Sequence, residues 1–255
     1  MNNHSYEPYD SIASIYDRWQ NSFSPPYYKI VRDRLLKVLR KYRIGPGRFL
    51  DLACGTGDAS VFMAEKGWDV TGVDSSVEML QKAKRKGGAY SVNISFIQQR
   101  LENLELDGTF TLAGSFYDSL NHITSKRTLA KALKQIRKHL GMDSLFLFDS
   151  NTLSCYQNLW ETTSVGHEEG YTLIIENRFD ESSGHATSNI TIFERGNGLQ
   201  YEKRVAKVDE RWYSDNEFER LLQRAGFEVI EREPIYLFRY NEPDPYKQWW
   251  VCKAV

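Results

Sequence analysis

Two glycines and two carboxylates stand out in the first third of the chain by their type and spacing. Gly55 and Gly57 lie directly after an apolar run that contains Asp51, and Asp74 ends the next apolar run. Glycines in a strand-to-helix turn let the backbone approach a ligand, and an acidic residue after the following strand can accept hydrogen bonds from both ribose hydroxyls of an adenosine. Two glycines alone also suit an ordinary tight turn. The combination with Asp74 fits nicotinamide dinucleotides and S-adenosylmethionine equally.

The carboxylate of Asp51 distinguishes these two ligands. It falls within the expected first strand, shortly before Gly55. A pyrophosphate there would meet an unfavourable negative charge, whereas the α-ammonium and sulfonium groups of S-adenosylmethionine would be attracted. We therefore favour S-adenosylmethionine and rank a nicotinamide dehydrogenase behind it.

Alternating strands and helices must position these residues. The apolar spacing predicts a helix over residues 27–43, then strands 48–53, 69–74, 94–98, 109–115 and 145–149, with helices 58–66, 75–88 and 128–140 between them. Ser75 and Glu78 have the spacing of a capping box at the start of one helix. This order predicts an α/β fold whose mostly parallel sheet has helices on both faces and binds ligands at the carboxyl ends of its strands.

The pattern changes after about residue 154. Residues 171–178, 185–195 and 199–208 are rich in β-forming residues and separated by turn residues, which predicts an inserted antiparallel β lid. A capping box at Ser214 and Glu217 then opens a helix, and strands 227–232 and 247–254 complete the main sheet. We expect one domain made of residues 1–153 and 209–255, with residues 154–208 as an insertion that covers the substrate.

Composition limits the partners. Thirty-three Lys and Arg against 34 Asp and Glu give a net charge of −1, so no global basic field attracts nucleic acid or anionic lipid. The 3 cysteines lack a C-x-x-C pair, which argues against zinc and a disulfide framework. Since no signal peptide or apolar span is present, we expect a cytoplasmic protein without a membrane partner. A homodimer remains compatible with these features.

Two motifs resemble those of class I S-adenosylmethionine-dependent methyltransferases. The sequence LDLACGTG at residues 50–57 resembles the family's first motif, and residues 73–80 resemble its second. Residues 116–121, 148–152 and 212–227 are similar to later segments of its small-molecule branch. The resemblance implies a Rossmann-like class I methyltransferase sheet, S-adenosylmethionine as cofactor, and methyl transfer to an N or O of a small-molecule acceptor. An RNA methyltransferase of the same fold and a non-catalytic nucleotide-binding regulator remain as alternatives.

The resemblance also implies a set of cofactor-binding residues. Those after the first strand would line the methionine moiety, Asp74 would hold the ribose, and Ser75 with Met79 would flank the adenosine. Arg100 stands where the family commonly has an Asp that accepts the adenine amino group, so Gln99 or a backbone carbonyl would have to replace that contact. The full set is Tyr16, Trp19, Asp51, Gly55, Thr56, Gly57, Asp74, Ser75, Met79, Arg100, Leu101, Ser115 and Phe116.

Aromatic residues crowd the N-terminus, where residues 9–10 and 16–19 resemble a segment that folds over the cofactor in this family. Aromatic faces attract cations, so Tyr16 is expected to contact the sulfonium. Trp19 equally fits an aromatic that packs an N-terminal helix onto the sheet. The expected lid comprises Tyr6, Tyr9, Tyr16, Trp19, Phe23, Tyr27 and Tyr28.

Three polar residues after the fourth expected strand are the candidate catalytic group: Tyr117, Asn121 and His122. Methyl transfer from a sulfonium mainly requires geometry and a dry site, and a hydroxyl acceptor also benefits from a base. His122 is the candidate base, although it equally fits a loop histidine without a role. Asp149 and Asn151 lack a third ligand, so no metal is expected.

Overall fold

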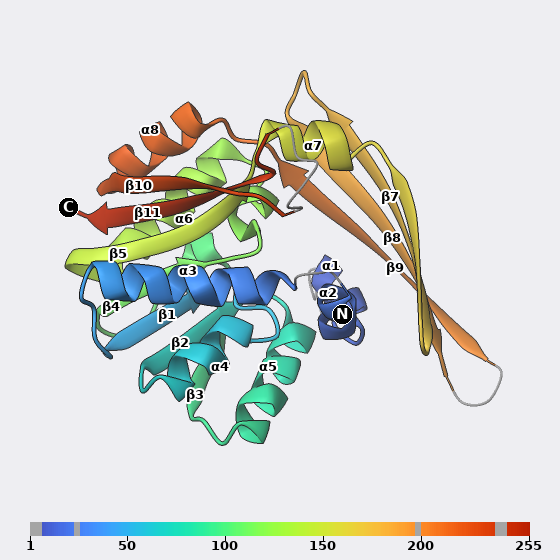
Figure 1. The fold of residues 1–255 in the computed structure, drawn as a ribbon, viewed down its shortest axis with the longest axis horizontal. Helices are drawn as coiled ribbons and strands as arrows, with labels where there is room; N and C mark the ends of the chain where they lie inside the picture. Colours follow the sequence, from blue (N-terminus) through green and yellow to red (C-terminus); the bar gives the residue numbers. More distant parts are fainter. Residues whose placement is uncertain (1–6, 23–25, 197–199, 238–243) are drawn as a thin grey trace.

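The computed structural model describes residues 7–22, 26–196, 200–237 and 244–255. Tyr6 and Phe23 of the expected lid lie outside these ranges. Two sheets organise the chain (Figure 1): one of seven strands in the order β10-β11-β5-β4-β1-β2-β3, and one of four in the order β6-β7-β8-β9. The first sheet and its helices confirm the predicted α/β fold.

The main sheet is parallel from β3 to β5, and β11 is antiparallel to both β5 and β10. Its strands are β1 (Arg48–Leu52), β2 (Asp69–Asp74), β3 (Ile94–Gln98), β4 (Phe110–Ser115), β5 (Leu140–Asn151), β10 (Phe227–Ile235) and β11 (Lys247–Ala254). The predicted strand 145–149 is too short, because β5 pairs with β4 from Leu140 onward and with β11 up to Asn151.

Helices cover both faces of this sheet. They are α3 (Tyr27–Lys41), α4 (Asp58–Glu65), α5 (Val77–Ala89), α6 (Lys126–Lys138) and α8 (Asp215–Ala225), with short 3₁₀ turns η1 (Leu101–Asn103) and η2 (Ser119–His122). Successive side chains of a strand point to opposite faces. Accordingly Leu50 and Leu52 of β1 join a buried cluster with α6 and α8, while Phe49 joins a second cluster with α3 and α4.

The start of α5 corrects one local prediction. Ser76, rather than Ser75, caps the helix, since its hydroxyl accepts a hydrogen bond from the Met79 backbone N–H at 3.1 Å. The Ser75 hydroxyl instead donates to Glu7 at 3.1 Å. At α8 the predicted capping box of Ser214 and Glu217 is present.

The second sheet is antiparallel throughout and follows helix α7 (Leu153–Leu159). Its strands are β6 (Thr163–Glu168), β7 (Tyr171–Asp180), β8 (His185–Arg195) and β9 (Tyr201–Arg211). The sequence pattern predicted the last three strands but missed β6. All six residues of β6 are exposed, so no apolar alternation marks this strand.

The N-terminal lid, defined here as residues 7–22, lies between the two sheets (Figure 1) and contains α1 (Pro8–Ile12) and α2 (Tyr16–Asn21). Ile12 and Ile15 are buried in a cluster that joins Met79 of α5 to Ile192 and Val208 of the second sheet. The lid therefore packs on both sheets at once. Among the described residues, no helix has the length and apolar character to span a membrane.

Three polar contacts connect the lid to α5 and to the second sheet. Asp10 accepts a hydrogen bond from the Ser76 hydroxyl at 2.6 Å. Asp17 pairs with Lys86 of α5 at 3.0 Å, and Arg18 pairs with Glu194 of β8 at 2.9 Å. These pairs connect the lid to a helix of the main sheet and to a strand of the second sheet.

Candidate functional site

A cavity of about 390 Å³ lies at the carboxyl ends of β1, β2, β3 and β4 under the lid. This volume falls within the range of small-molecule sites. Twelve of the residues expected to act at the site line it: Tyr16, Asp51, Gly55, Thr56, Asp74, Ser75, Met79, Arg100, Leu101, Phe116, Tyr117 and His122. Segments far apart in the sequence thus contribute to one wall.

The turn between β1 and α4 follows a left-handed path. Ala53, Gly55 and Gly57 have φ angles of 52°, 53° and 82°. Gly55 lines the cavity. Gly57 does not border it, and a Cβ on Gly57 would lie 3.0 Å from the Ala83 Cβ, so this glycine permits close packing of α4 and α5.

Asp74 is held in one orientation at the end of β2. One carboxylate oxygen accepts the backbone N–H of Gly55 at 2.8 Å, and the other accepts that of Ser76 at 2.9 Å. Burial raises the pKa of this carboxyl above its ordinary value, although these hydrogen bonds oppose the shift. The carboxylate oxygens retain lone pairs for a ligand in the cavity.

Asp51 is a buried acid on the cavity wall, only 2% exposed. The Ser60 hydroxyl donates to it at 2.5 Å. Burial raises the pKa of Asp51 to about 7, because the charged form is poorly solvated there. The site therefore holds a carboxyl whose ionisation near neutral pH responds to the charge of a ligand.

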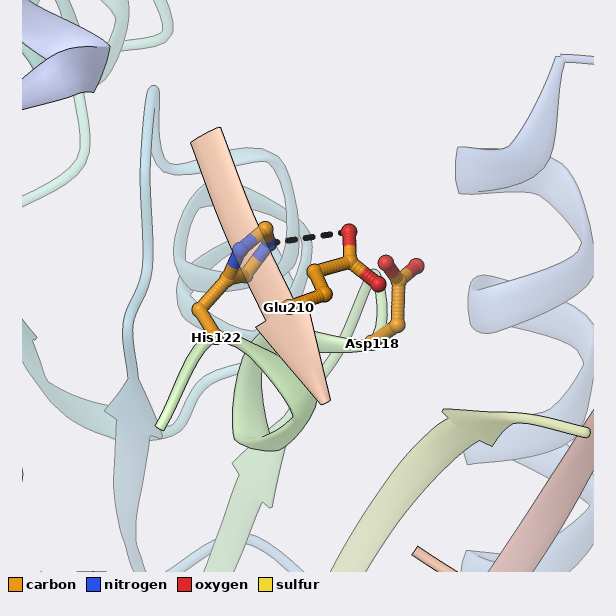
Figure 2. A group of neighbouring side chains, drawn as sticks. All are labelled: Asp118, His122 and Glu210. Carbon is orange, nitrogen blue, oxygen red and sulfur yellow. Dashed lines mark ion pairs between the residues drawn. The ribbon is translucent and has the colours of Figure 1, made fainter. Parts of the chain in front are cut away.

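His122, at the end of η2, lines the cavity and contacts the lid. Its Nε2 is 2.9 Å from the Tyr9 hydroxyl. Figure 2 shows the side chains of His122, Glu210 and Asp118 turned toward one another. The Nε2 atom of His122 is 3.8 Å from a Glu210 oxygen. Burial lowers the pKa of His122 although the Asp118 carboxylate opposes this, so the imidazole is neutral at physiological pH.

A buried ion network stabilises the loop that carries Tyr117 and Asp118. Lys247 of β11 pairs with Asp118, and it lies 3.2 Å from Asp149 of β5. Asp149 in turn accepts the backbone N–H groups of Tyr117 and Asp118, each at 2.8 Å. Tyr117 and Asp118 have φ angles of 61° and 50°, a conformation that costs free energy for non-glycine residues. Asp149 therefore holds the loop that carries the cavity-lining Tyr117.

Asp118, His122 and Glu210 place potential metal-ligand atoms within 4.8 Å of one another. Both carboxylates already have partners: Asn151 donates to Asp118 at 3.0 Å and to Glu210 at 3.1 Å, and Tyr156 donates to Glu210 at 2.7 Å. Burial raises the pKa of Glu210 well above its ordinary value, and the Asp118 charge adds to this. The arrangement suits the holding of a proton better than the binding of a cation, and the sequence-based expectation of no metal stays a prediction.

Four expected site residues lie away from the cavity wall: Trp19, Gly57, Ser115 and Asn121. Trp19 packs edge-on against Tyr16, with ring centroids 6.2 Å apart. Ser115 is fully buried in β4. Asn121 is also fully buried; it donates to the Arg211 carbonyl at 2.8 Å and accepts the Asn151 N–H at 3.1 Å, so it joins β9 to β5.

Sequence reasoning missed several residues around the cavity. Glu7 lines it from the lid, and Lys207 and Asp209 line it from β9. Tyr9, which the sequence placed in the expected aromatic lid, also lines the cavity. Glu210, which faces His122, belongs to no motif, and only the folding of β9 against η2 brings it there.

Comparisons with known proteins agree on one family. A family model described as a methyltransferase domain matches residues 49–143. A putative methyltransferase of Geobacillus sp. (strain WCH70) is 31% identical over 225 residues, which cover 88% of this chain and 90% of that protein.

Two solved structures share the fold. An S-adenosylmethionine-dependent methyltransferase from Clostridium acetobutylicum superposes with a TM-score of 0.83 at 24% identity and covers 97% of this chain and 99% of its own. The sugar N-methyltransferase KedS8 from Streptoalloteichus sp. superposes with a TM-score of 0.72 at 19% identity, covering 94% and 92%.

Proposed function

The chain belongs to the class I S-adenosylmethionine-dependent methyltransferases, and from this premise we propose that it methylates an N or O atom of a small-molecule acceptor held beside His122. The observation that carries this proposal is a single cavity that extends from Asp51 and Asp74 to His122 under one lid. The sugar N-methyltransferase with the same fold is an example of such an acceptor class.

The cofactor fits the half of the cavity at the ends of β1, β2 and β3. The α-ammonium group would lie near Asp51 and Gly55, with the ribose hydroxyls on Asp74. The adenine would then extend toward Met79 and Leu101, both of which line the cavity. Tyr16 and Phe116 border the space left for the sulfonium, which aromatic faces attract.

The acceptor fits the other half, between the lid, the β4–α6 connection and β9. Tyr9, Tyr117 and His122 face this space, and Lys207 and Asp209 close it from the second sheet. We propose on this basis that residues 154–208 act as a substrate-covering insertion. A space roofed from two sides suits a small molecule better than an RNA duplex.

The reaction is an in-line displacement. Bound S-adenosylmethionine would supply the methyl group: the acceptor's lone pair would form a bond to the methyl carbon, and the electron pair of the broken carbon–sulfur bond would stay on sulfur in S-adenosylhomocysteine. His122, neutral because of its burial, accepts by way of the Tyr9 hydroxyl, 2.9 Å from Nε2, the proton that a hydroxyl or amine acceptor releases. Tyr9 passes its own hydroxyl proton to Nε2 and takes up the proton of the acceptor. The lid excludes water from the transferring methyl group.

Thermal unfolding with added ligands tests the cofactor and its site. S-adenosylmethionine or S-adenosylhomocysteine at 100 times its Kd should add about 2.7 kcal/mol of stability, because each binds only the native state. Asp74→Ala should lose most of this response. Stabilisation by NAD and by neither sulfur compound would contradict the proposal, and an unchanged response of Asp74→Ala would place the ribose elsewhere.

A further inference from the structure

The wall of the cavity expected to face adenine contains a guanidinium at position 100. Arg100 lines the cavity, and its Nη1 is 2.5 Å from a carboxylate oxygen of Glu7 in the lid. Its Nε donates to Glu102 at 3.0 Å. The acidic group that is absent from position 100 itself is therefore supplied through space by Glu7.

Glu7 bridges the ends of two strands. Its Oε1 accepts from Arg100, after β3, and its Oε2 accepts the Ser75 hydroxyl, after β2, at 3.1 Å. The Glu7 side chain is only 15% exposed and lines the cavity. With the ribose on Asp74, immediately before Ser75, the base must enter the space between these two strand ends. The Glu7 carboxylate faces that space.

The pair of Glu7 and Arg100 has the hydrogen-bonding pattern that complements adenine. A carboxylate only accepts and a guanidinium only donates. The adenine edge offers the opposite order, with a donor at N6 next to an acceptor at N1. Hypoxanthine has an acceptor at position 6 and a donor at N1, so both contacts would be mismatched.

We propose that Glu7 of the lid, together with Arg100, recognises the adenine base of the cofactor, and that this contact couples cofactor identity to completion of the acceptor site. This inference rests on the proposed function. Tyr9, which contacts His122, lies in α1 directly beyond Glu7. Glu7 and Tyr9 lie at the same end of the lid, so loss of the adenine contact at Glu7 should also weaken the contact of the Tyr9 hydroxyl with the imidazole.

Calorimetric titration with two ligands tests the base contact. S-adenosylhomocysteine should bind the wild-type protein about tenfold or more tightly than S-inosylhomocysteine, since the latter would place its O6 acceptor against the Glu7 carboxylate and its N1–H donor against the Arg100 guanidinium. Glu7→Gln should reduce this ratio to about threefold or less, because an amide can rotate to donate to the hypoxanthine oxygen.

Two variants serve as controls. Asp10→Asn weakens another lid contact, to Ser76, from a residue that does not line the cavity. Asp10→Asn should change the affinities for S-adenosylhomocysteine and S-inosylhomocysteine by the same factor and leave their ratio unchanged. Glu102→Gln alters the other carboxylate beside Arg100 and should also preserve the ratio.

The outcomes distinguish the two proposals. Equal wild-type affinity for both ligands overturns the base contact and leaves the methyltransferase assignment intact. If the affinity ratio of the two ligands falls in Glu102→Gln but not in Glu7→Gln, the role of Glu7 is overturned. A wild-type protein that binds neither ligand overturns the cofactor site and this inference together.

Hydrogen exchange measures the coupling to the lid. Saturating S-adenosylhomocysteine should slow amide exchange in residues 8–12 more than saturating S-inosylhomocysteine does in the wild-type protein. In Glu7→Gln the two ligands should protect this segment equally. Equal protection already in the wild-type protein overturns the coupling.

Discussion

At the scale of single residues, burial sets the protonation state of the groups around the cavity. The pKa of Asp51 rises to about 7 and that of Glu210 rises well above its ordinary value, because both carboxyls are removed from water. The same cause lowers the pKa of His122, since an imidazolium is also poorly solvated there. The site therefore has an acid, Asp51, that ionises when a cationic ligand binds, and a base, His122, that is already neutral.

Cofactor binding should release protons through Asp51. With a pKa of about 7, the empty site holds about half a proton there at pH 7, and a bound ammonium and sulfonium favour the ionised form. Titration calorimetry at pH 7 in buffers of different ionisation enthalpy should detect this release, which should disappear well above pH 8. Asp51→Asn should abolish it, whereas Asp58→Asn should retain it. Equal release by Asp51→Asn and the wild type would assign the proton to another group.

The rate of methyl transfer to a hydroxyl acceptor should depend on His122. The base works only when neutral, so activity should persist as pH falls to about 6.5, the ordinary histidine value, and be lost as pH falls further through the lowered pKa. His122→Ala should reduce kcat by about 100-fold and remove this acidic limb. His167→Ala, on the exposed strand β6, should leave both unchanged. An intact kcat in His122→Ala would remove His122 as the base.

At the scale of elements, the ends of β4, β5 and β11 meet around one buried ammonium. Lys247 joins the Asp118 loop to Asp149 of β5, and Asp149 holds the two left-handed residues of that loop. A change in β11 should therefore alter the loop beside the acceptor space although β11 itself does not line the cavity.

Replacement of Lys247 should be strongly destabilising. Lys247→Met leaves the buried Asp149 and the partly buried Asp118 without their cation and should lower the free energy of unfolding by about 3–5 kcal/mol, measured by urea denaturation. Lys253→Met removes another lysine of β11, whose partner Asp143 is exposed, and should leave the urea midpoint unchanged. Equal effects of the two substitutions would contradict a structural role of the buried network.

The elements of the main sheet could be predicted because their signals are local. Apolar runs, glycine turns and the Ser214 capping box mark strands and helices within a few residues of sequence. Exposed β6 carries no such signal. The positions of Glu7 and Glu210 in the site could not be predicted either, because each acquires its role only through contacts with distant segments.

At the scale of the whole molecule, two sheets and a lid enclose one cavity, and the net charge is −1. The cofactor half is built from the main sheet, so a family motif locates most of it in the sequence. The acceptor half depends on β9 and the lid, which explains why the motif leaves that half undetermined.

The near-neutral charge predicts weak affinity for RNA. A labelled ribosomal RNA fragment should show no saturable binding at 150 mM salt, because few phosphate contacts are available to release counterions. Tight binding that weakens steeply with added salt would instead favour an RNA methyltransferase. A basic protein of similar size serves as the positive control.

The attachment of the lid also fixes an order of events during protein synthesis. The lid is translated before β8 and β9, yet its Ser14 and Arg18 contact Glu194, and the Arg204 side chain completes the same group. These partners follow the lid residues they contact by 176 to 190 residues in the sequence. Contacts so distant in sequence form late in folding. A nascent chain can therefore fold much of its parallel sheet while the cavity remains open, and the roof closes only after β9 has been synthesised.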